Sequence, residues 1–125
     1  MCYGTLDAEV GDALRSWCNT TREDAPSPGL ALDTFEAAVT GYLSGADSTT
    51  TPAERAAIVP GLERITLELS ARFAADALVE SYFGWDAEIA PTQGDHNLLR
   101  AHNQLGLARQ VADRRETLLA IVAGV

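Results

Sequence analysis

The chain has 125 residues, of which 46% are hydrophobic, and this length and composition suit one domain with a buried core over residues 1–125. Its formal net charge is −9 and it contains no lysine, which argues against nucleic acid and anionic membranes as partners because both would repel it. No apolar stretch is long enough to cross a bilayer. Cys2 and Cys18 occur without a signal-peptide pattern, which favours a cytoplasmic protein with reduced thiols.

The predicted elements are helices, in chain order. Apolar residues at helical spacing predict a first helix from Leu6 to about Cys18. Residues 19–29 are rich in proline, threonine, aspartate and glycine, a composition that stops helices, and we expect a loop there. Asp33 stands three residues before Glu36 as in a capping box, and this pair predicts a second helix that ends by Gly45.

A third, short helix is predicted where Thr51, Pro52 and Glu54 supply an N-cap, a first-turn proline and the returning carboxylate. Pro60 and Gly61 are expected to break or kink it, after which a central helix restarts. The apolar face of this central helix is wide enough to predict burial on its flanks as well as its centre. The residues concerned are Leu62, Ile65, Leu67, Leu69, Phe73, Leu78 and Val79.

Residues 82–94 are predicted to form an aromatic-rich crossing loop. Asp95 is expected to cap the last and longest helix, which runs to Val122. No strand-like alternation of useful length occurs. The sequence therefore predicts an all-α fold, a compact bundle of about five helices with an aromatic loop before a long C-terminal helix.

Two stretches of the chain resemble a known family. Residues 11–17 (GDALRSW) are similar to the segment that follows the magnesium-binding loop in aminoglycoside-phosphotransferase and choline-kinase-like enzymes. A second, longer run is similar to the C-terminal helices of N-acetylhexosamine-kinase-like sugar kinases. It comprises Ile65, Arg72, Phe73, Asp76, Tyr82 and Phe83, then His96, Asn97 and Leu98, with Arg100, Gln104 and Leu105.

The resemblance implies a helical subdomain that resembles the substrate-side part of a phosphotransferase C-lobe and holds a small hydroxylated or amino-sugar ligand. The catalytic loop, the magnesium-binding aspartate and the ATP lobe of that family have no counterpart in this sequence. We therefore expect a truncated or remnant phosphotransferase domain that is inactive alone and uses no cofactor, with ATP and magnesium implied only for the full-length family. The expected partners are a second copy or a separate chain bearing the ATP lobe. The alternative is a helical binding or oligomerisation module unrelated to catalysis.

Two charged pairs are candidates for the substrate pocket. Asp12 and Arg15 lie three residues apart on the first helix, and an ion pair that anchors this helix to its neighbour is favoured over ligand binding. Arg72 and Asp76 lie four apart on the central helix. A buried bridge is favoured there because an unpaired buried charge is costly, and the alternative is that Arg72 binds a sugar hydroxyl or a carboxylate.

The loop aromatics and the histidines complete the candidates. Tyr82 and Trp85 have faces that suit a sugar ring, although such a cluster more often closes the end of a bundle. His96 and His102 are six residues apart, about 240° around one helix, so they cannot share a metal as an i, i+4 pair would. No catalytic residue and no metal site is expected. The candidate substrate-binding residues are Asp12, Arg15, Arg72, Asp76, Tyr82 and Trp85.

Overall fold

The computed structural model describes residues 6–45 and 50–125, and it confirms the all-α prediction. Within these ranges the chain forms six helices, which are α1 (Leu6–Cys18), α2 (Leu32–Gly45), α3 (Pro52–Ala56), α4 (Ile58–Val79), α5 (Gln93–Asp113) and α6 (Arg115–Ala123). None of the helices in the described ranges is long and apolar enough to span a membrane. Cys2 lies outside the described residues.

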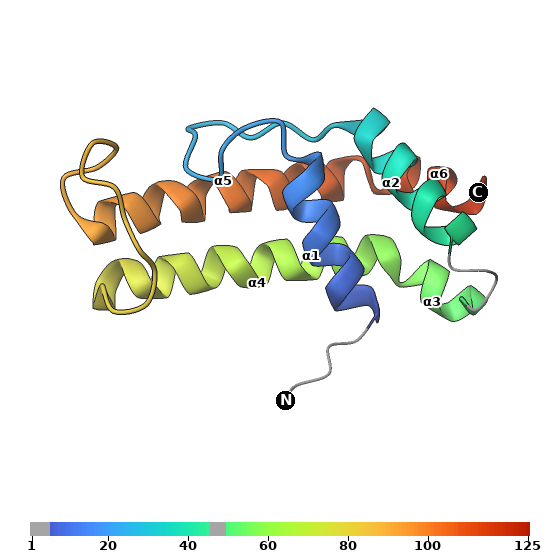
Figure 1. The fold of residues 1–125 in the computed structure, drawn as a ribbon, viewed down its shortest axis with the longest axis horizontal. Coiled ribbons are helices and arrows are strands. Elements are labelled where there is room, and N and C mark those ends of the chain that lie inside the picture. The colour runs from blue at the N-terminus through green and yellow to red at the C-terminus, as the bar shows by residue number, and fades with distance from the viewer. Residues whose placement is uncertain (1–5, 46–49) are drawn as a thin grey trace.

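The two longest helices organise the molecule. Figure 1 shows α4 and α5 side by side as a hairpin, with α1 crossing over α4 and with α2, α3 and α6 gathered at one end. The loop formed by residues 80–92 closes the opposite end of the hairpin. Between these two ends the hairpin is covered by α1 and by the 19–31 loop, which lies along α5.

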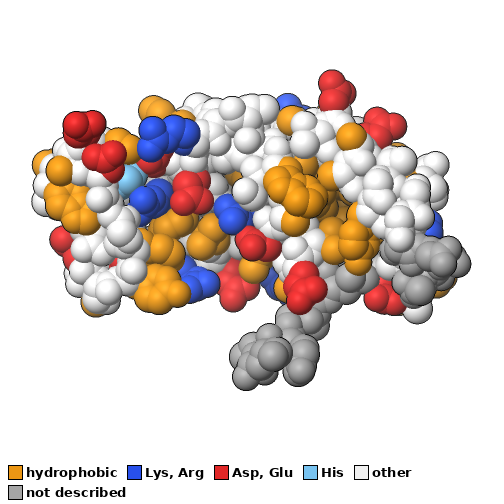
Figure 2. Space-filling view, viewed as in Figure 1, with side chains coloured by type: hydrophobic (Ala, Val, Ile, Leu, Met, Phe, Trp, Pro, Cys, Tyr) orange, Lys and Arg blue, Asp and Glu red, His pale blue; other side chains and the backbone are white. Residues whose placement is uncertain are grey.

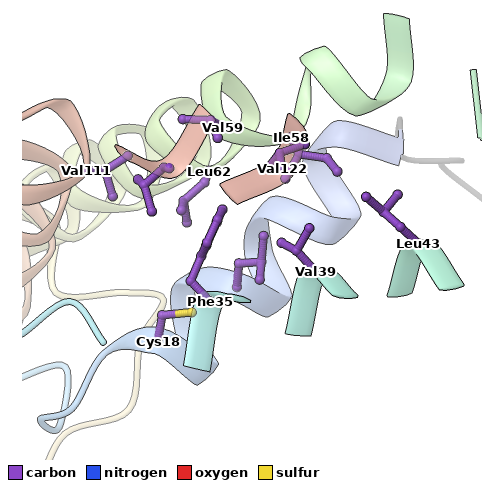
Figure 3. Packing of buried hydrophobic residues seen from close by; sticks show 11 residues of the cluster. Cys18, Phe35, Val39, Leu43, Ile58, Val59, Leu62, Val111 and Val122 are labelled. Carbon is purple, nitrogen blue, oxygen red and sulfur yellow. The ribbon is translucent and has the colours of Figure 1, made fainter. Parts of the chain in front are cut away.

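The core lies where α1, α2, α4, α6 and the C-terminal end of α5 meet. Figure 3 shows the Phe35 ring between Cys18 of α1 and Leu62 of α4, and all three side chains are fully buried. The buried cluster comprises Leu14, Cys18, Phe35, Val39, Leu43, Ile58, Val59, Leu62, Val111, Leu118 and Val122. Burial of this apolar surface is the main stabilising contribution to the fold.

The crossing of α1 over α4 depends on a close backbone approach at Gly11. A Cβ atom at this position would lie 2.8 Å from the carbonyl oxygen of Gly61 and 3.0 Å from the backbone nitrogen of Leu62. These distances are well inside van der Waals contact, so only glycine fits without a shift of one helix. Gly11 therefore sets the spacing between α1 and α4.

The predicted helix starts are partly confirmed. Thr51 and Glu54 form the reciprocal capping box of α3 as predicted. The predicted cap of α5 is wrong, because Thr92 is the N-cap and its hydroxyl oxygen accepts the N–H of Asp95 at 3.0 Å. Asp95 lies inside the first turn, where its charge still favours the positive end of the helix.

The predicted helix breaks are also displaced. Pro60 and Gly61 lie inside the first turn of α4, which begins at Ile58, because a proline is tolerated where no intrahelical N–H bond is needed. The break before α4 falls at Ala57 instead. The last helix is interrupted at Arg114, so the predicted long helix is divided into α5 and α6 and the longest helix is α4, with 22 residues.

The predicted burial of the central helix is only half correct. Leu62 and Phe73 are buried, but Leu67, Leu78 and Val79 are 44%, 88% and 68% exposed. The reason is that α1 and α5 cover one side of α4 and, among the described residues, no element covers the other. The apolar residues on the flanks therefore face solvent.

Candidate functional site

A cleft of about 480 Å³ lies between α1, α4 and the 80–92 loop. Four of the six predicted binding residues line it, namely Asp12, Arg15, Arg72 and Tyr82. The remaining lining residues are Ala8, Glu9, Ile65, Glu68, Leu69 and Phe83. Figure 2 shows hydrophobic side chains interspersed with charged ones on the face that α1 crosses. The structure thus brings together residues from three segments that are far apart in the sequence.

Arg15 is fixed at one side of this cleft by three partners. Its Nε and Nη2 donate to Asp12 Oδ1 at 3.0 Å, Nη1 donates to Gln104 Oε1 at 3.1 Å, and Glu23 lies 3.6 Å away. The Arg15 side chain is only 13% exposed. The predicted Asp12–Arg15 ion pair is confirmed, and it anchors α1 to α5 through Gln104.

A buried polar network continues from Gln104 into the 19–31 loop. The Gln104 amide donates to Asn103 Oδ1 at 3.2 Å, and Asn19 Nδ2 donates to the same oxygen at 3.0 Å. Asn103 Nδ2 in turn donates to the carbonyl oxygen of Ala25 at 2.8 Å. Because buried amides are costly without partners, these contacts fix the loop against α5.

Arg72 faces the other side of the cleft and is exposed. Its guanidinium carbon lies 5.6 Å from the ring centre of Tyr82 and 6.0 Å from that of Phe83, which are cation–π distances. The predicted buried bridge between Arg72 and Asp76 is wrong, since no carboxylate of the described residues lies within ion-pair distance of Arg72. The rings hold the guanidinium in place and leave its N–H groups free to donate.

Asp76 is buried and orders the turn that follows α4. Its carboxylate accepts the backbone N–H groups of Ser81, Tyr82 and Phe83, each at 3.0 Å, and the side-chain amide of Asn97 at 3.0 Å. The N–H of Phe83 contributes most, and together these donors outweigh burial and hold the pKa of Asp76 below its usual value. Both oxygens are used inside the protein, which explains why this acid is buried.

The aromatic side chains of the 80–92 loop differ in how far they are exposed to solvent. Phe83 packs on Phe73 of α4 with ring centres 4.4 Å apart, and Tyr82 meets Phe83 edge to face at 4.8 Å. Tyr82 is 72% exposed at the mouth of the cleft, whereas Trp85 is 42% exposed and lies outside the lining of the cleft. The structure therefore brings Tyr82, but not Trp85, to Arg72.

His96 connects two loops and has no ring nitrogen left for a substrate. Its Nδ1 accepts the backbone N–H of Asp86 at 3.1 Å, so the ring proton is on Nε2, which donates to Asp24 at 2.7 Å. Burial raises the pKa of Asp24, but the hydrogen bond from His96 and the charge of Arg22 outweigh it and lower the pKa. In the part of the chain that the structure describes, no three histidine, cysteine or acidic side chains are grouped to hold a metal ion.

The sequence reasoning missed two acidic residues of the cleft. Glu9 precedes Asp12 by three residues on α1, and Glu68 precedes Arg72 by four on α4, so each shares a helix face with a residue that was predicted. That spacing is the signal that would have found them.

The sequence of this chain matches no known protein family and no curated protein sequence. The resemblance to phosphotransferases therefore stays a prediction from the order of the short motifs.

Proposed function

We propose that this chain is a substrate-side helical domain of the phosphotransferase type, whose cleft between α1, α4 and the 80–92 loop binds a small hydroxylated or amino-sugar ligand. One observation carries the proposal. Asp12, Arg15, Arg72 and Tyr82 were predicted from separate motifs, and they line one cleft. In this proposal the domain transfers no phosphoryl group by itself, and a separate lobe provides ATP and magnesium. We assign it to the cytoplasm, where the free thiol of Cys18 stays reduced.

The hydrogen-bonding groups of the cleft suit hydroxyl groups. Arg72 offers donors, while the carboxylates of Glu9 and Glu68 are free of the hydrogen bonds and ion pairs found among the described residues and offer acceptors. A hydroxyl group both donates and accepts, so a polyol matches such a mixed lining. Ile65 and Leu69 supply apolar surface for the C–H face of a sugar ring.

The charge of the cleft sets the class of ligand. Its lining contains the carboxylates of Glu9, Asp12 and Glu68 and the guanidinium groups of Arg15 and Arg72, a net charge of −1. A neutral or cationic ligand is favoured over a polyphosphate, which the carboxylates repel. The isolated chain should therefore give no calorimetric signal with magnesium-ATP, and specific binding of this nucleotide would contradict the proposal.

The direct test is an NMR titration of the amide signals with glucosamine, N-acetylglucosamine and choline. At least one ligand should shift the signals of Glu68, Arg72 and Tyr82. Arg72→Ala should weaken its binding about tenfold or more, because a hydrogen bond from a charged group contributes about 1.5–3 kcal/mol. Arg109→Ala is the matched control, since Arg109 is exposed on α5 and is not part of the lining.

Two results would count against the proposal. One is the absence of any shift with all three ligands at millimolar concentration. The other is an equal loss of binding in the Arg72→Ala and Arg109→Ala variants, because a general charge effect would then explain it. The alternative function, a binding or oligomerisation module unrelated to catalysis, predicts the first of these results.

A further inference from the structure

The solvent-facing side of α4 is unusually apolar. Seven of its ten exposed positions carry apolar side chains, and the three charged ones are Arg64, Glu68 and Arg72. The apolar positions are Pro60, Leu67, Ala71, Ala74, Ala75, Leu78 and Val79. Contiguous exposed apolar surface on a folded protein often marks an interaction site. Among the described residues nothing covers this side of α4, which makes it a candidate contact surface for a partner.

The spacing of the exposed residues points to a second copy of the same chain. Leu67, Ala71, Ala74 and Leu78 follow one another at intervals of four, three and four, which is the seam of a heptad pattern. The order Leu-Ala-Ala-Leu and these intervals read the same in both directions. When two copies of α4 lie antiparallel about a two-fold axis, Leu67 faces Leu78 of the partner subunit and Ala71 faces Ala74 of the partner subunit. Such self-complementarity is what a two-fold interface requires.

The charges agree with this arrangement. The whole chain has a net charge of −9, so two copies repel each other over most of their surface, but the exposed positions of α4 include a single acidic residue, Glu68. In the antiparallel register Glu68 lies level with position 77 of the partner subunit. The two Glu68 side chains are then about 13.5 Å apart along the axis, beyond a Debye length of about 8–10 Å. The two Arg72 side chains are almost level along the axis, but they lie about 130° around the helix from the seam. This face is therefore a place where two copies can meet at little electrostatic cost.

We propose that α4 pairs antiparallel with α4 of a second copy through Leu67, Ala71, Ala74 and Leu78. The alanines allow the two helix backbones to approach closely, and the leucines close the ends of the contact. One pair of helices buries less surface than the roughly 800 Å² per partner of a standard interface, so the dimer is weak and depends on concentration. This inference does not depend on the ligand proposed for the cleft.

Sedimentation over a range of concentrations provides the first test. The apparent mass should rise from monomer towards dimer, and Leu67→Glu and Leu78→Glu should each weaken the dimer at least tenfold. Leu119→Glu is the matched control, because Leu119 is an exposed leucine on α6 and receives the same charge. A monomer at every concentration would overturn the proposal, and so would a loss of the dimer in Leu119→Glu but not in Leu67→Glu.

Disulfide cross-linking tests the register with smaller substitutions. In a Cys2→Ser background, a mixture of the Leu67→Cys and Leu78→Cys variants should cross-link, since these positions face each other across the interface. Each variant alone should not, because its two thiols lie eleven residues apart along the axis, about 16.5 Å, and a disulfide needs Cα atoms within about 7 Å. Cross-linking of Leu67→Cys alone at the rate of the mixture would indicate a parallel or non-specific contact and overturn the antiparallel pair.

Discussion

Gly11 provides a sharp test of the packing that forms the cleft. The substitution Gly11→Ala adds one methyl group where α1 crosses α4, and that group would lie 2.8 Å from a backbone carbonyl oxygen of Gly61. A side chain can rotate away from such a clash, but a backbone carbonyl inside a helix cannot. The two helices must therefore move apart, and the cleft that they line widens with them.

The size of the effect follows from two opposing contributions. Overpacking by one methyl group costs about 1–3 kcal/mol, and replacing glycine by alanine within a helix returns about 0.5–1 kcal/mol. The difference spans about 0–2.5 kcal/mol, and because the clash is with a backbone atom that cannot rotate away, we expect a net loss of about 1–2 kcal/mol. With an unfolding entropy of about 2.1 cal/mol/K per residue over 125 residues, each kcal/mol corresponds to about 4 °C in Tm, so Tm should fall by about 4–8 °C.

Gly41→Ala is the matched control for this prediction. Gly41 also lies within a helix, but a Cβ atom there would have no neighbour within 4 Å. This variant should gain about 0.5–1 kcal/mol and raise Tm by about 2–4 °C. Thermal unfolding followed by circular dichroism measures both variants. An equal rise in Tm for Gly11→Ala would refute the close crossing of α1 and α4.

Three further predictions concern buried groups. Phe35→Ala should lower the free energy of unfolding by about 3–5 kcal/mol in urea titrations, because the ring is fully buried, and a loss below about 1 kcal/mol would contradict this. The N–H of Phe83 and neighbouring donors lower the pKa of Asp76 in the folded state, so the ionised carboxylate stabilises the fold. This contribution to the free energy of unfolding is complete above about pH 5, and it is lost as the pH falls through about 3.9 towards the folded pKa. Asp76→Asn should remove this part of the acid dependence of unfolding, and an unchanged pH profile would count against the assignment. Burial raises the pKa of the Cys18 thiol to about 11, so iodoacetamide at about pH 8 should label it far more slowly in the folded protein than in urea, and equal rates would show that the thiol is not buried.

The amino-acid sequence by itself determined the local structure. The capping box of Thr51 and Glu54 and the ion pair of Asp12 and Arg15 each join residues three positions apart, so their geometry is fixed within one helical turn. The all-α class follows in the same way, because helical periodicity needs only neighbouring residues. Where the local signal was ambiguous, as for Asp95, the predicted boundary was wrong by a few residues.

The tertiary structure alone decided which sides of the helices are covered and which residues share a site. Arg15 meets Gln104 across 89 positions, and no spacing rule connects residues so far apart. The same limit explains Arg72, whose predicted partner is Asp76, four residues away, but whose contacts are the rings of Tyr82 and Phe83. Periodicity indicates that a helix side is apolar, whereas its burial depends on the packing of distant helices. For this reason Leu67 and Leu78 lie in solvent on a helix that was expected to be buried.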